Sequence, residues 1–84
     1  MKFGMRYSNT GEFRQADRAV ELVQAGERAG FESAWTVEHI LIPPTYESKY
    51  PYTADGRNPS SDEKTYHPDP MMWMMYAAAH TSAI

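Results

Sequence analysis

Residues 25–39, AGERAGFESAWTVEH, decide the fold of this 84-residue chain. Apolar residues recur at three- and four-residue steps from Phe13 to Ala29, which is typical of an amphipathic helix. Gly30 is suited to end that helix in a left-handed conformation, with Phe31 packing back onto the last turn. Glu32–Val37 then predicts a short strand. We therefore expect a helix that stops at Gly30 and leads directly into a strand.

A first strand precedes this helix. Apolar and other residues alternate over Lys2–Tyr7, and the turn-forming residues 8–11, SNTG, follow directly. A strand, a helix and a second strand within about 36 residues have the spacing of a βαβ unit. The two strands should therefore be parallel.

The composition changes after residue 42, since all six prolines lie beyond it. Residues 43–68 have neither a helix nor a strand period, and we expect a long loop of the lid type that covers active sites. Asp69 and Pro70 are typical of a helix N-cap and first helical residue. They predict a second helix over 71–82, and the last residues, 81–84, resemble a turn into a third strand.

The second helix is apolar around its whole circumference from Met71 to Ala79. One amphipathic helix and two short strands do not provide enough cover for it, because a parallel sheet normally carries helices on both faces. We therefore expect an α/β chain that is the N-terminal βαβ-loop-α portion of a larger βα-repeating protein. The alternative is a self-contained or oligomerising small domain.

Charge and cysteine content exclude several classes of protein. Eight Lys and Arg against eleven Asp and Glu give a net charge of -3, which provides no footprint for DNA or RNA. The chain has no cysteine, and we expect no metal site because His39, His67 and His80 are too scattered in sequence to form a local ligand pair. No signal peptide or membrane span is expected, so the default compartment is the cytoplasm.

Five segments together resemble the N-terminus of the luciferase-like monooxygenase superfamily: MKFGMRYSNTG, AGERAGFESAW, VEHILIP, YESKYPYTADGR and DPMMWMMYAAAHTSAI. This resemblance implies that residues 1–84 are the first part of one (β/α)8 TIM barrel. It also implies a flavin- or deazaflavin-dependent oxidoreductase that acts on a small organic substrate, with a homo-oligomer possible for the full-length enzyme. The isolated 84-residue chain is then expected to be inactive.

The loop sequence IPPTYESKYPYTADGR resembles the branch that depends on the deazaflavin coenzyme F420. Glu38 stands where that branch commonly has Asp, as in many relatives that use flavin mononucleotide (FMN). Those relatives often have a second histidine after the first, and here that residue is Ile40. The resemblance therefore implies F420 as the cofactor, with FMN as the alternative.

Glu38 and His39 are the main candidate site residues, because they follow a parallel strand at the end where barrel enzymes place catalytic groups. An imidazole exchanges a proton near neutral pH. The resemblance implies that His39 is catalytic and that both residues contact the cofactor; the alternative is a histidine bonded to backbone at a strand end. Ser8, Asn9 and Tyr46 are weaker candidates for the substrate pocket.

Three functions are compatible with these features. The first is hydride transfer between F420 and an organic substrate, and the second is FMN-dependent monooxygenation. The third belongs to another class, a small interaction module whose Met- and Trp-rich helix binds a partner groove.

Overall fold

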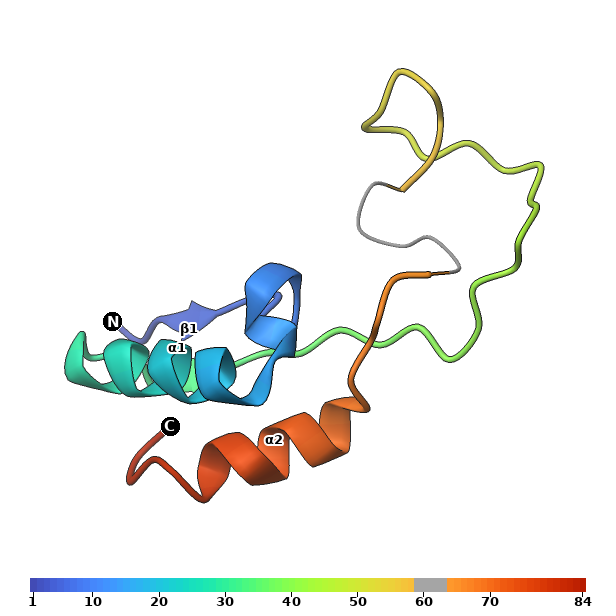
Figure 1. Ribbon diagram of the computed structural model, residues 1–84. Helices are drawn as coiled ribbons and strands as arrows, with labels where there is room; N and C mark the ends of the chain where they lie inside the picture. Colours follow the sequence, from blue (N-terminus) through green and yellow to red (C-terminus); the bar gives the residue numbers. More distant parts are fainter. Residues whose placement is uncertain (59–63) are drawn as a thin grey trace.

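The computed structural model describes residues 1–58 and 64–84. The helices and strands in order are β1 (Gly4–Met5), the 3-10 helix η1 (Gly11–Arg14), α1 (Ala16–Arg28), β2 (Ser33–Ala34) and α2 (Pro70–Ala78). Figure 1 shows α1 and α2 side by side, with β1 on the far side of α1 from α2 in this view, and residues 40–58, which follow β2, projecting away from them.

The two strands are parallel, as predicted, with Gly4 opposite Ser33 and Met5 opposite Ala34. Regular strand geometry covers only two residues of each predicted segment. Backbone hydrogen bonds nevertheless continue the pairing: the Glu32 N–H donates to the Phe3 carbonyl at 2.9 Å, and the Trp35 N–H donates to the Met5 carbonyl at 2.8 Å. The prediction that segments 2–7 and 32–37 pair in parallel is therefore confirmed, although regular strand geometry is shorter than expected.

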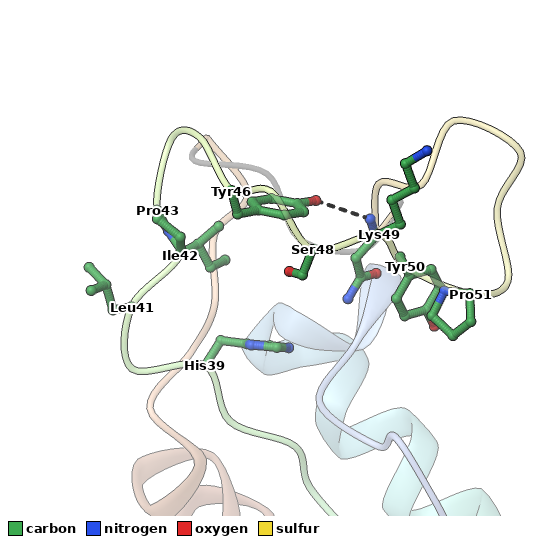
Figure 2. A pocket seen from close by; sticks show the side chains of 10 residues that line it. His39, Leu41, Ile42, Pro43, Tyr46, Ser48, Lys49, Tyr50 and Pro51 are labelled. Carbon is green, nitrogen blue, oxygen red and sulfur yellow. Dashed lines mark hydrogen bonds between the residues drawn. The ribbon is translucent and has the colours of Figure 1, made fainter.

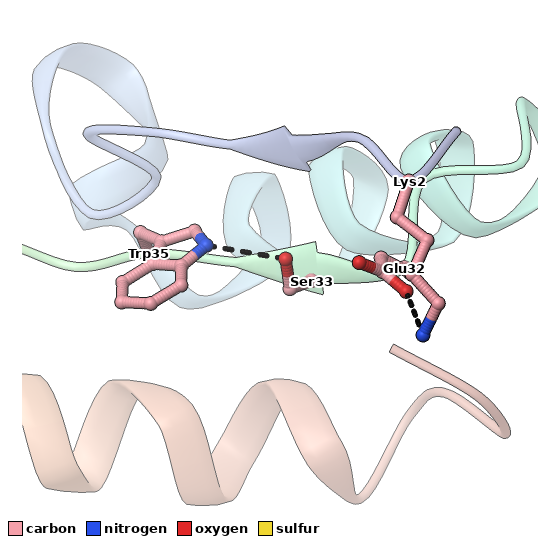
Figure 3. Close-up of polar contacts among 4 residues, drawn as sticks. All are labelled: Lys2, Glu32, Ser33 and Trp35. Atoms are coloured by element: carbon pink, nitrogen blue, oxygen red, sulfur yellow. Dashed lines mark hydrogen bonds and ion pairs between the residues drawn. The ribbon is translucent and has the colours of Figure 1, made fainter.

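At the open end of this pair Lys2 forms an ion pair with Glu32 at 3.0 Å (Figure 3). The Trp35 indole N–H donates to the Ser33 hydroxyl on the same strand at 3.1 Å. The Lys2 and Glu32 side chains are exposed, so their ion pair contributes little to stability.

Helix α1 ends as the sequence predicts. Gly30 has φ +84°, its N–H donates to the Glu27 carbonyl at 3.1 Å, and the Phe31 N–H donates to the Gly26 carbonyl at 3.0 Å. This pair of bonds is the Schellman cap. The predicted start at Phe13 is wrong, because Phe13 lies in η1 and the extended backbone of Gln15 separates η1 from α1.

Helix α2 begins where it was expected, at Pro70, and the Asp69 carboxylate accepts the Met72 N–H at 2.9 Å. It ends at Ala78, earlier than the predicted residue 82. The Glu27 carboxylate of α1 accepts the backbone N–H groups of Ser82 and Ala83, which holds the chain in a turn there. Within the described residues no third strand follows this turn.

The core lies between α1 and α2 and consists of Ala19, Val23, Trp73 and Ala77. The Trp73 indole N–H donates to the Phe13 carbonyl at 2.8 Å, which ties α2 to η1. The accessible surface is 6460 Å², against about 5,100 Å² for a compact domain of this mass. The chain therefore leaves much apolar surface uncovered, including Met71, Met72 and Met75 of α2.

Candidate functional site

The candidate site begins where the chain leaves β2. Asn9 is buried, and its Nδ2 donates to the Val37 carbonyl at 2.7 Å while its Oδ1 accepts the Val37 N–H at 2.9 Å. These two bonds extend the parallel pairing beyond the last strand residue. Residues 35–39 have no regular strand geometry. Glu38 and His39 therefore lie on irregular backbone directly after Val37, which these two hydrogen bonds hold in place.

His39 lies on a wall that two cavities share. One cavity has a volume of about 320 Å³ and lies under the loop that carries Tyr46. The other has a volume of about 430 Å³ and is also lined by Tyr7, Thr10, Val37 and His67. His39, Tyr50 and Asn58 line both. Both volumes lie in the range of small-molecule sites.

Figure 2 shows the His39 ring beneath the loop that carries Tyr46 and Ser48. The loop turns back on itself after Tyr50, whose N–H donates to the Gly56 carbonyl at 2.7 Å. Gly56 has φ +70° and is buried, and a Cβ there would lie 3.2 Å from the Lys49 side chain. Tyr46 accepts the Asn58 N–H on its hydroxyl at 3.4 Å. Glycine therefore allows the turn that follows Tyr50, which lines both cavities together with His39.

The described parts of the predicted loop, 43–58 and 64–68, contain neither helix nor strand. Residues 59–63 of that prediction lie outside the described residues. Asp55 shows how the turn is held: the Arg57 N–H donates to its carboxylate at 3.0 Å, and this bond, with the Thr53 hydroxyl, holds the pKa of Asp55 below its usual range. The loop thus has its own hydrogen bonds in 53–57.

His67 lies beside His39, a proximity that their separation in the sequence did not predict. The ring centroids are 5.7 Å apart and the planes meet at 61°, an edge-to-face arrangement. The two histidines are 28 residues apart in sequence and meet because the chain returns to the strand end just before α2. Partial burial, and then the positive charges of Arg14 and His39, lower the pKa of His67.

The side chains of Ser8 and Asn9 form hydrogen bonds with backbone groups. Ser8 is buried, its N–H donates to the Trp35 carbonyl at 2.9 Å, and its hydroxyl donates to the Met5 carbonyl at 3.3 Å. Neither Ser8 nor Asn9 lines the two cavities beside His39. Their occurrence in a turn gave no way to distinguish a pocket residue from a residue that holds the turn.

Two neighbours of these residues line the cavity instead. Tyr7 and Thr10 both belong to the wall of the 430 Å³ cavity. Tyr7 has φ +59°, an uncommon conformation for a residue with a side chain. Its carbonyl accepts the Thr10 N–H at 3.2 Å and the Thr10 hydroxyl at 2.7 Å, which hold this tight turn.

Glu38 is exposed and does not line either cavity, although it is adjacent to His39. Tyr46 does line the 320 Å³ cavity. Within the described ranges no three His, Asp or Glu side chains come together to hold a metal ion. Neither helix of the described chain has the length and apolar content needed to cross a membrane.

Parallel strands joined by a helix, with ionisable residues and cavities beyond the carboxyl end of a strand, are the arrangement of α/β enzymes. The chain belongs to the luciferase-like monooxygenase family, whose family model matches residues 1–84. This family consists of oxidoreductases, which favours the enzyme class over an interaction module. Neither the curated proteins nor the solved structures give a significant match.

Proposed function

We propose that this chain is the N-terminal part of an F420-dependent oxidoreductase that transfers a hydride between F420 and a small organic substrate. The observation that carries the proposal is the position of His39 beyond the carboxyl end of β2, on the wall shared by the two cavities. Family membership supports oxidoreductase chemistry. The loop sequence beginning at Ile42 supports F420 through its resemblance to that branch.

The lining of the 430 Å³ cavity supports a planar deazaflavin or flavin ring as its ligand. Tyr7 and Tyr50 provide aromatic surface, and Thr10, Asn58 and His39 provide polar groups at the edge. A planar heteroaromatic ring requires this combination of apolar faces and polar edges. We propose that Glu38 adds a further polar contact at the exposed side, either to the ring edge or to the imidazole of His39.

When bound, the deazaflavin provides or accepts the hydride. The role of His39 is to donate or accept the proton that accompanies the hydride at the substrate, because an imidazole can do both near neutral pH. The 320 Å³ cavity, which has both His39 and Tyr46 on its wall, is the proposed place for the substrate. The loop 43–68 is then the lid of this site.

Exposed apolar side chains support the proposal that this chain is part of a (β/α)8 barrel. Ile40 is 90% exposed and Leu41 is 79% exposed, directly after His39, and Met72 and Met75 of α2 are also exposed. In a (β/α)8 barrel, neighbouring strands and helices cover such surfaces. The parallel pair with α1 between its strands is the repeating unit of that fold.

Equilibrium binding tests the choice of cofactor. The intact protein, meaning the full-length enzyme that contains residues 1–84, is titrated separately with F420 and with FMN. Binding is followed by the change in cofactor fluorescence. We expect F420 to bind the more tightly. Tighter binding of FMN would favour the monooxygenase alternative, which the glutamate at position 38 supports. Failure of both to bind would contradict the proposed function.

A further inference from the structure

His67 is a second histidine in the candidate site with no part in the chemistry proposed for His39. It lies just before α2, and its ring packs edge-to-face against His39 with centroids 5.7 Å apart. Both rings line the 430 Å³ cavity, together with Tyr7 and Tyr50. The contact between the two imidazoles is therefore within the site and not on a remote surface.

The surroundings of His67 favour an uncharged ring. Partial burial lowers the pKa of His67 first, and the charges of Arg14 and His39 lower it further. Its Nε2 is buried and has no hydrogen-bond partner among residues 1–58 and 64–84. A proton on this nitrogen would be a buried donor without an acceptor, which costs free energy. Both features favour the neutral form of the His67 ring over the charged form.

We propose that His67 is a positioning residue for His39: its ring packs against His39 and sets the plane in which that imidazole faces the cavity. This rests on the proposed role of His39. Edge-to-face packing has a preferred geometry, and proton transfer is sensitive to small displacements of the transferring group. A charged imidazole at position 67 would repel His39 whenever His39 takes up a proton, so a neutral ring is the suitable neighbour.

Kinetics of the intact protein test the proposal, with reduced F420 as hydride donor and menadione as acceptor. One hydride and one proton convert menadione to its hydroquinone. His67→Ala should lower kcat by about tenfold to a hundredfold, with KM for menadione and F420 binding nearly unchanged. His67→Phe keeps a ring at this position and should retain most of the turnover.

His80→Ala is the matched control, because His80 is exposed, follows α2, and bonds through its ring to the Tyr76 carbonyl of that helix. It should not change turnover. If His67→Ala keeps full turnover while His39→Ala loses it, the positioning role is wrong and the proposed function stands. If both variants keep full turnover, both are wrong. If His67→Phe loses as much turnover as His67→Ala, ring packing is not the cause and the proposal fails.

Nuclear magnetic resonance of the wild-type protein provides a test that does not depend on variants or on turnover. With ring-labelled histidines, we expect cross-relaxation between the ring protons of His39 and His67, and none between His39 and His80. Absence of the first signal would overturn the proposal even if His67→Ala does not fold.

Discussion

Asn9 holds the backbone of Val37 with both ends of its amide: Nδ2 donates to the Val37 carbonyl at 2.7 Å, and Oδ1 accepts the Val37 N–H at 2.9 Å. A side chain from the turn that follows β1 thus replaces the backbone in continuing the parallel pairing. Because Glu38 and His39 follow Val37 directly, this contact determines where the candidate site residues leave the sheet.

Asn9→Ala should lower the free energy of unfolding by about 1–3 kcal/mol, because it leaves both polar groups of the Val37 backbone without their partner. Urea denaturation of the intact protein measures the change. The control is Gln15→Ala, whose side chain is exposed and makes no capping bond, with an expected change within about 0.5 kcal/mol. Equal stability of the two variants would show that the Asn9 contact does not stabilise the fold.

The sequence was sufficient to predict the βαβ unit, because its signals are local. Apolar periodicity indicated α1, glycine at position 30 indicated its end, and Asp69 with Pro70 indicated the start of α2. The role of Asn9 was not predictable, because it depends on a contact with Val37 across the sheet. The short 3-10 helix before α1 was missed for a similar reason: Phe13 fits the apolar period although it precedes the extended residue Gln15.

Asp69→Ala should destabilise the protein by about 0.5–2 kcal/mol, because the Met72 N–H loses its acceptor at the start of α2. Asp69→Asn is the matched control, since asparagine is an equally good N-cap. Thermal unfolding followed by circular dichroism measures both. A loss of stability in Asp69→Asn equal to that in Asp69→Ala would show that charge and not capping is responsible.

Stability should fall as the pH is lowered from about 6.5, the ordinary value for histidine, through the lower pKa of folded His67. In this interval His67 is protonated in the unfolded chain but not in the folded chain, so lowering the pH favours unfolding. His67→Phe should make the stability less dependent on pH in this interval, and His80→Phe should not. Urea denaturation at several pH values compares them. Identical pH dependence in His67→Phe and wild type would contradict the prediction.

The contact between His39 and His67 could not be predicted from local sequence patterns. A proline-rich segment without helix or strand period gave no indication of where it returns to the fold. The structure brings its last residues back beside His39. The strand-end position of His39 itself was predictable, because it depends only on the order of helix and strand.

The 84-residue chain should self-associate in solution, because α2 exposes apolar side chains that a stable monomer normally covers. Met71 is 63% exposed, and Met72 and Met75 are each 67% exposed. Sedimentation velocity should show concentration-dependent association, reduced in the double variant Met72→Lys, Met75→Glu. A monodisperse wild-type monomer with a cooperative thermal transition would show that this surface needs no cover.

In the proposed function, His39 donates or accepts the proton that accompanies hydride transfer. The most direct test is turnover of the intact protein with reduced F420 and menadione. Here Glu38→Gln is a companion variant, expected to weaken cofactor binding with a smaller effect on turnover. His39→Ala should lower turnover by about two to four orders of magnitude, while F420 binding remains largely intact. Near-wild-type turnover of His39→Ala at saturating F420 and menadione would contradict the claim and leave His39 a structural residue at the strand end.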